Sequence, residues 1–309
     1  MRMRKVPLLV TLIAATLLAA EAAHADDPVD QVKPDDSASR HAIDRTWLYA
    51  DDARVAEPMT VTTTGSLSYT SVGNSPSRVV TAFPGCSAPC NAYNAFGANT
   101  ATPGGMFQVG GELGLVPRLS VMGIAQMGTG GSDGVPSPNV GALAGLRFDV
   151  LPPEWRTTHL TLSGGYLRES WQGPHYVDDT HSWVPGSAGG DNGAWVRAAF
   201  SADFRRLRVA TTLHGEHVFA AGRDAVDVMV QAGASYRVAG DFRAGVEYVG
   251  QDVEETFSPG AESGARHFVG PTASMQLLDR RFTVVAGPAV GLTARSPDVL
   301  GRLAASYSF

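Results

Sequence analysis

The sequence predicts an all-β protein, a transmembrane antiparallel up-and-down β-barrel of twelve strands that follows an export signal. Three observations predict it. The chain opens with a charged and then apolar segment, hydrophobic residues alternate with a period of two from residue 58 to the last residue, and aromatic residues gather near the ends of the alternating segments. Strands between two different environments alternate in this way, and membrane-spanning barrels carry aromatic residues at both interfaces.

Residues 1–25 have the layout of a secretory signal peptide. Basic residues precede an apolar stretch over 6–20, and the small-x-small pattern of a cleavage site follows at 23–25. The apolar stretch falls short of the roughly 20 residues that a membrane-spanning helix needs. We therefore expect cleavage, and a mature chain that begins near Asp26.

The composition excludes several classes of protein. With 44% hydrophobic and 17% charged residues, the chain is too apolar to be disordered. Its net charge of −6 and its lack of basic clusters argue against binding of nucleic acid. No glycine pattern of a nucleotide site opens a helix, so we expect no cofactor.

The two cysteines, Cys86 and Cys90, lie close together in the sequence. In an exported chain such a pair is expected to form a disulfide. Two thiols make an incomplete zinc site, so the sequence predicts a structural loop staple and no metal.

The alternating pattern predicts the strands in order. Most are 12 to 14 residues long, which exceeds the roughly 9–11 that a tilted spanning strand needs and the roughly 5–6 of soluble strands. The predicted ranges are 58–72, 105–116, 118–129, 138–151, 158–169, 192–204, 206–219, 225–238, 240–252, 265–278, 280–293 and 298–309.

The predicted connections alternate between short and long. Short periplasmic turns and longer outer loops are the rule in outer-membrane barrels. Both chain ends then lie in the periplasm, which requires an even number of strands. The barrel domain is thus predicted to span 58–309.

Pro271 and Pro288 fall inside predicted strands and nearly oppose each other. Each removes a hydrogen bond from the ladder. A shared bulge or local gap is predicted between these strands.

The chain ends in Leu-Ala-Ala-Ser-Tyr-Ser-Phe, with Tyr307 two residues before the terminal Phe309. This end resembles the last-strand signal of Gram-negative outer-membrane β-barrel proteins, which the barrel-assembly machinery reads. The resemblance implies a location in the outer membrane, with membrane lipid around the barrel and the assembly machinery as a partner during biogenesis. It points to no narrower family.

Charged residues at inward positions are the candidates for function. The predicted lumen-lining residues are Glu112, Arg147, Asp149, Arg197, Asp203, Arg208, His214, Glu216, Arg237, Arg243, Glu247 and Arg302. Buried charges must be paired or hydrated. They line a narrow aqueous passage whose Arg-rich periplasmic half favours anions, or they pair across the lumen and close it.

Residues 26–57 are acidic and contain one apolar island at 47–49. Such a composition buries little surface, so this segment is either a mobile periplasmic tail or a plug whose carboxylates meet the arginines of the lumen. The sequence leaves both open.

The sequence therefore favours a porin-like or narrow solute channel and not an enzyme. The first alternative is a closed barrel with a structural or surface-binding role. The second is an outer-membrane lipid hydrolase. His217 and His267 face outward near the outer edge, but the pattern offers no positioned serine to activate.

Overall fold

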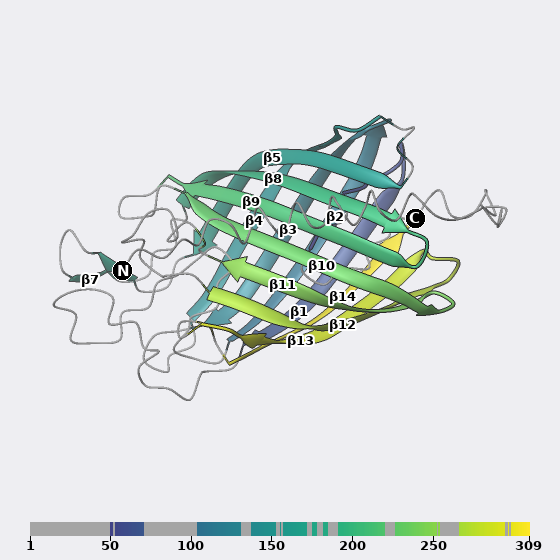
Figure 1. Ribbon diagram of the computed structural model, residues 1–309. Helices are drawn as coiled ribbons and strands as arrows, with labels where there is room; N and C mark the ends of the chain where they lie inside the picture. The colour runs from purple at the N-terminus through teal and green to yellow at the C-terminus, as the bar shows by residue number, and fades with distance from the viewer. Residues whose placement is uncertain are drawn as a thin grey trace, which may run out of the picture. The chain divides into compact units, whose positions relative to one another are not determined.

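The computed structural model forms one closed antiparallel barrel of twelve strands (Figure 1). The described residues are 50–70 except 52, 104–130, 137–171 except 153, 154 and 156, 175–177, 182–184, 191–219, 226–251, 253, 266–293, 296 and 298–309. They belong to one compact unit, Ser39–Phe309. None of these residues forms a helix long and apolar enough to cross a membrane.

The barrel strands are 10 to 14 residues long. They are β1 (Val61–Thr70), β2 (Gly104–Val116), β3 (Leu119–Gly130), β4 (Ser137–Asp149), β5 (Thr158–Trp171), β8 (Asp191–Phe204), β9 (Leu207–Val218), β10 (Asp227–Ala239), β11 (Phe242–Gln251), β12 (Arg266–Leu277), β13 (Phe282–Gly291) and β14 (Val299–Ser308). Each pairs with the next, and β1 pairs with β14 to close the sheet. The fold class and all twelve strands predicted from the sequence are confirmed.

A short hairpin between β5 and β8 was not predicted. It consists of β6 (His175–Val177) and β7 (Ser182–Val184), which pair with each other outside the barrel sheet. The predicted disulfide between Cys86 and Cys90 lies outside the described residues, so it stays a prediction.

The first strand begins later than predicted. Residues 58–60 form a turn in which the amide of Thr60 donates to the carbonyl of Glu57 at 3.0 Å. Met59 has φ of 64°, which a strand residue cannot adopt. The chain thus turns at Met59 before it enters the wall at Val61.

The connections that follow β2, β4, β8, β10 and β12 lie at one end of the barrel, which also carries the C-terminus (Figure 1). We name it the turn end, and the opposite end the loop end. The connections at the turn end are 117–118, 150–157, 205–206, 240–241 and 278–281. Arg118 has φ of 74°, and its guanidinium donates to the carbonyls of Asp149 and Val150 at 2.8 Å each. The guanidinium of Arg118 therefore ties the turn after β2 to the end of β4.

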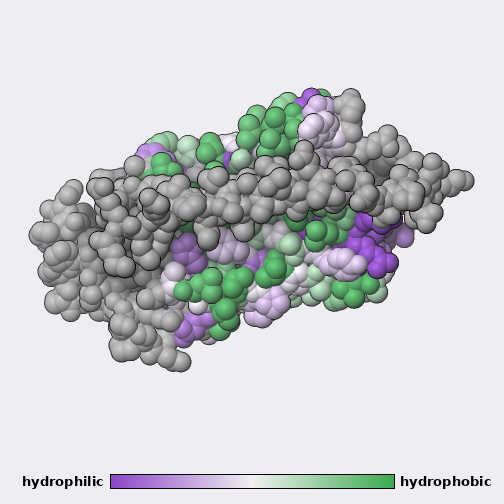
Figure 2. Space-filling view, viewed as in Figure 1, coloured by the Kyte–Doolittle hydropathy of each residue, from purple (hydrophilic) through white to green (hydrophobic). Residues whose placement is uncertain are grey.

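The outer wall is apolar. In β9, buried and more exposed residues alternate along the strand. The exposed positions of the wall include Leu67, Val109, Leu146, Val196, Leu213 and Leu303, and exposed aromatics near strand ends include Tyr69, Phe107, Phe148, Tyr166, Tyr236 and Phe309. Figure 2 shows several groups of hydrophobic residues on the parts of the wall that are visible. A folded protein with this outer surface requires a lipid environment.

The gap predicted at the prolines is present in the structure. The pairing of β12 with β13 runs from Phe268 and Val269 directly to Ala273, with no pairs between residues 270–272 and 287–289. The register is the same on both sides, so the ladder is interrupted and not shifted. A Cβ on Gly270 would lie 1.9 Å from the carbonyl oxygen of Pro288, so only glycine allows this approach of the two backbones.

We expect fast hydrogen exchange along this interruption. The amides of residues 270, 272, 287 and 289 should exchange faster than those of 196–199 in β8, because the pairing of β8 with β9 is continuous. Exchange mass spectrometry of the folded protein in detergent measures both. Equal protection of the two regions would show that the gap does not weaken the wall.

Candidate functional site

A stretch of the chain before β1 lies inside the barrel. We name residues 50–57 the inner segment; Asp52 is not among the described residues. The amide of Ala50 donates to Oε2 of Glu247 on β11 at 3.0 Å, and the amide of Ala56 donates to Oε1 of Glu112 on β2 at 3.0 Å. Because β2 and β11 are on opposite sides of the closed sheet, the segment crosses the lumen. Ala53, between them, is fully buried.

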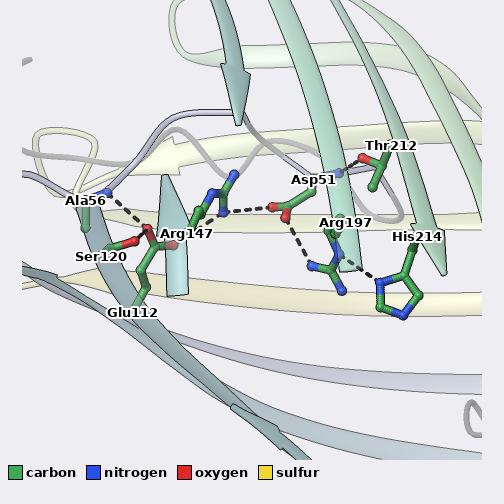
Figure 3. A network of polar contacts seen from close by, with 8 residues as sticks. All are labelled: Asp51, Ala56, Glu112, Ser120, Arg147, Arg197, Thr212 and His214. Carbon is green, nitrogen blue, oxygen red and sulfur yellow. Dashed lines mark hydrogen bonds and ion pairs between the residues drawn. The ribbon is translucent and has the colours of Figure 1, made fainter. Parts of the chain in front are cut away.

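Asp51 of the inner segment bridges two arginines of the wall. Arg147 on β4 donates from Nη1 to Oδ1 of Asp51 at 3.3 Å, and Arg197 on β8 donates from Nη1 to Oδ2 at 3.1 Å. The amide of Asp51 donates to Oγ1 of Thr212 on β9 at 2.9 Å. Figure 3 shows the carboxylate between the two guanidinium groups. Such charge-assisted bonds are roughly twice as strong as neutral ones.

Glu112 is the second carboxylate of this network. Its Oε1 accepts from the hydroxyl of Ser120 at 2.7 Å as well as from the amide of Ala56, and its Oε2 accepts from Nη1 of Arg147 at 3.4 Å. The side chains of Glu112 and Arg147 are 0% and 1% exposed. Two wall residues and the inner segment are thus held together by one buried carboxylate (Figure 3).

Arg197 continues the network toward the loop end. Its Nε donates to Nδ1 of His214 on β9 at 3.2 Å. Since Nδ1 of His214 accepts, a neutral imidazole carries its proton on Nε2, which lies 3.4 Å from Oε1 of Glu216. The ring of His214 stacks on Trp195, with centroids 5.9 Å apart. The hydrogen-bonded chain therefore runs from Asp51 through Arg197 to His214, and Glu216 lies beside the imidazole ring.

A second ionic group lies near the turn end. Asp203, at the end of β8, accepts from Nη2 of Arg208 at 2.9 Å. Arg54 of the inner segment also donates to the carboxylate of Asp203. Nearby in the wall, Arg243 donates to the backbone carbonyl of Arg206 at 3.4 Å. The inner segment is therefore bound to the wall through the carboxylate of Asp51 and through the guanidinium of Arg54.

The structure places all twelve predicted lumen residues at buried or partly buried positions. The networks above unite Glu112, Arg147, Arg197, Asp203, Arg208, His214 and Glu216. Of the others, Arg302 donates to Ser66 and Gln108, Asp149 accepts from the amide of Leu151, Glu247 accepts from Ala50, Arg243 donates to the carbonyl of Arg206, and the Nε of Arg237 is buried. The structure thus brings seven of the twelve predicted residues together in two groups.

Part of the inner wall is apolar. Met122, Leu167, Trp195 and Val218 pack together on β3, β5, β8 and β9, with Ile124 and Leu143 against them. We name these six residues the inner apolar patch. Trp195 also lies under Arg197, whose guanidinium carbon is 5.5 Å from the indole centroid. The patch therefore borders the Asp51 network directly.

Sequence reasoning missed Trp195, Thr212 and Arg54 as parts of the site. Trp195 has the same parity along β8 as Arg197, so the period of two gives it an inward position. Arg54 carried no such signal, because the inner segment has no periodic pattern. Its contact with Asp203 depends on the path of the segment through the barrel.

The two outward histidines are in different settings. His217 makes an edge contact with Phe219, with centroids 5.1 Å apart. Nδ1 of His267 bonds the hydroxyl of Tyr248 at 2.6 Å, while the hydroxyl of Ser296 bonds the backbone N–H and carbonyl of His267. Ser296, in the 292–298 connection, is thus bound to the start of β12. Neither contact is the serine–imidazole pair of a hydrolase.

Comparison with known proteins identifies the fold. No family model matches the chain, and no curated protein matches its sequence. Among solved structures, an outer membrane channel from Pseudomonas putida F1 gives a TM-score of 0.50 at 11% identity, over 85% of this chain and 100% of that one. The KdgM porin in complex with disordered oligogalacturonate gives 0.40 at 10% identity, over 81% and 99%. The translocator domain of the autotransporter NalP from Neisseria meningitidis gives 0.41 at 12% identity, over 83% and 91%. The first likeness shows a shared outer-membrane barrel fold.

Proposed function

We propose that this protein is a narrow solute channel of the outer membrane, and that the inner segment, residues 50–57, closes the channel. One observation carries the proposal. The inner segment is bound to opposite walls of the lumen, through Ala50 to Glu247 and through Ala56 to Glu112. A chain segment held in this way blocks the barrel, and its removal leaves a passage lined by charged and hydroxyl groups. The structural neighbour from Pseudomonas putida, itself a channel, supports this proposal by its fold.

The proposal includes an orientation and a charge preference. Short turns face the periplasm in outer-membrane barrels, so the turn end and the C-terminus are assigned to the periplasmic side. The predicted signal peptide would be removed, and both mature ends would lie in the periplasm. Arg147, Arg197, Arg208 and Arg243 would then line the periplasmic half, and once the inner segment is absent their field favours anions.

A closed barrel with a structural role is the second candidate. It is favoured by the ion pairs that wall residues form with each other, Glu112 with Arg147 and Asp203 with Arg208. Such pairs reduce the charge available to a passing ion. The two candidates differ in whether removal of the inner segment produces conductance.

Single-channel recording in a planar bilayer tests the proposal. Refolded protein from residue 26 to 309 should be silent or conduct weakly, whereas a variant that lacks 26–57 should show discrete steps. The reversal potential of that variant under a salt gradient should shift toward the anion. In that variant the carboxylate of Asp51, which pairs with Arg147 and Arg197, is missing.

Deletion of 26–49 alone is the matched control. It removes most of the mature N-terminal residues but leaves the inner segment, so its records should equal those of the protein that begins at residue 26. Silence of the variant that lacks 26–57, with its barrel folded, would reject the channel and favour the closed barrel.

A further inference from the structure

We propose that Arg147 and Arg197 form a binding site for the carboxylate of an organic solute with an apolar body, and that Asp51 occupies this site as an internal competitor. The inference rests on the proposed function, because it names the class of solute that such a channel would admit. It also explains why the inner segment places an acid at this point of the lumen.

The contacts of Asp51 define the carboxylate site. Each of its oxygens accepts from a different guanidinium, Oδ1 from Arg147 and Oδ2 from Arg197. Both arginines belong to the barrel wall, whereas the carboxylate belongs to the segment that crosses the lumen. The site therefore consists of two fixed donors, and any carboxylate that reaches them is able to replace the one of Asp51.

Because the two arginines are largely buried, the site favours an anion as its occupant. The side chain of Arg147 is 1% exposed and that of Arg197 is 14% exposed. Charges at such positions need a partner, because the loss of hydration is costly. When Asp51 leaves, the charge-assisted bonds that its carboxylate accepts from Arg147 and Arg197 are lost. A solute anion then supplies the charge that Asp51 supplied.

The apolar requirement comes from Trp195. Its ring lies 5.5 Å from the guanidinium carbon of Arg197 and belongs to the inner apolar patch, with Met122 and Leu167. The patch thus adjoins the arginine pair. An apolar body against the patch, with its carboxylate toward the arginines, matches both surfaces at once.

Titration calorimetry with sodium benzoate tests the inference on protein of residues 26–309 in detergent micelles. The Asp51→Asn variant should bind benzoate with a dissociation constant on the order of tenfold lower than the unchanged protein, because the tethered competitor has lost its charge. Adding Arg147→Gln or Arg197→Gln to that variant should abolish binding. Adding Arg302→Gln, which changes an arginine bound to Ser66 and Gln108, should leave binding unchanged.

Two further probes separate the parts of the site. Benzamide, which lacks the charge, should not bind to the Asp51→Asn variant, and acetate, which lacks the apolar body, should bind more weakly than benzoate. Benzamide binding as tight as that of benzoate would overturn the carboxylate site, and acetate binding as tight as that of benzoate would overturn the apolar requirement. Heat-dependent gel mobility verifies folding, and the variant that lacks 26–57 replaces Asp51→Asn if the latter does not fold.

The carboxylate site and the channel can be rejected independently of each other. If benzoate binds no better after Asp51→Asn, or if loss of both arginines leaves binding intact, the inference is rejected even when the variant that lacks 26–57 conducts. If benzoate binds as expected but no variant conducts, the channel is rejected and the carboxylate site remains.

Discussion

Replacement of Gly114 by valine is expected to expel the inner segment from the lumen and to produce the conductance steps of the variant that lacks 26–57. A Cβ at this position would lie 1.9 Å from the carbonyl oxygen of Glu57 and 2.5 Å from that of Ala56. Both are backbone atoms, so the clash is not relieved by a change of rotamer. The amide of Met59 also donates to the carbonyl of Gly114 at 2.9 Å, which places the segment directly on this glycine.

Two measurements verify the displacement. Bilayer recording gives the conductance, and hydrogen exchange measures the protection of the Ala56 amide. In the closed state this amide donates to the carboxylate of Glu112. In the Gly114→Val variant that amide should lose its protection. The change replaces no charged residue, so it tests the position of the segment without altering its charge.

Gly111→Val is the matched control on the same strand. A Cβ at Gly111 meets only the carbonyl oxygen of Thr62, at 3.6 Å, which is an ordinary contact. This variant should remain closed. If both variants behaved alike, or if Gly114→Val remained silent while the variant that lacks 26–57 conducted, the contact at Gly114 would not hold the segment in place.

Replacement of Glu112 by alanine is expected to give the largest loss of stability, about 3–5 kcal/mol in the free energy of unfolding, as when one partner of a buried ion pair is removed. The change leaves the buried guanidinium of Arg147 without this carboxylate and removes the acceptor of Ser120 and Ala56. Urea unfolding of the barrel in lipid vesicles, with linear extrapolation, measures the loss.

Two variants apportion this effect. Glu112→Gln keeps an oxygen for Ser120 and Ala56 but removes the charge, so its loss should be smaller. In the Glu112→Ala, Arg147→Leu double variant no buried guanidinium remains at this point, and the double variant should be more stable than Glu112→Ala alone. A loss below about 0.5 kcal/mol for Glu112→Ala would mean that the network adapts without its acid.

Local pattern accounts for the agreement between the predicted and observed strands. Each predicted strand overlaps an observed one, because the side-chain period of two depends only on successive residues. The ends differ where the turn needs residues with positive φ. The turn of 278–281 has three such residues, Leu278, Asp279 and Arg280, which the sequence pattern assigned partly to strands. Positive φ at leucine or arginine has no signal in composition.

The amino-acid sequence by itself determined the class, the number and order of the strands, and which residues face inward, because all of these follow from a local period and from the apolar outer surface that a membrane requires. Only the tertiary structure decided which inward charges meet. Asp51 binds arginines 96 and 146 positions away in the chain, and these distances close only through the circumference and stagger of the barrel. The path of residues 50–57 across the lumen is likewise a product of closure, since the strands that carry Glu247 and Glu112 enclose the segment only when β1 has joined β14.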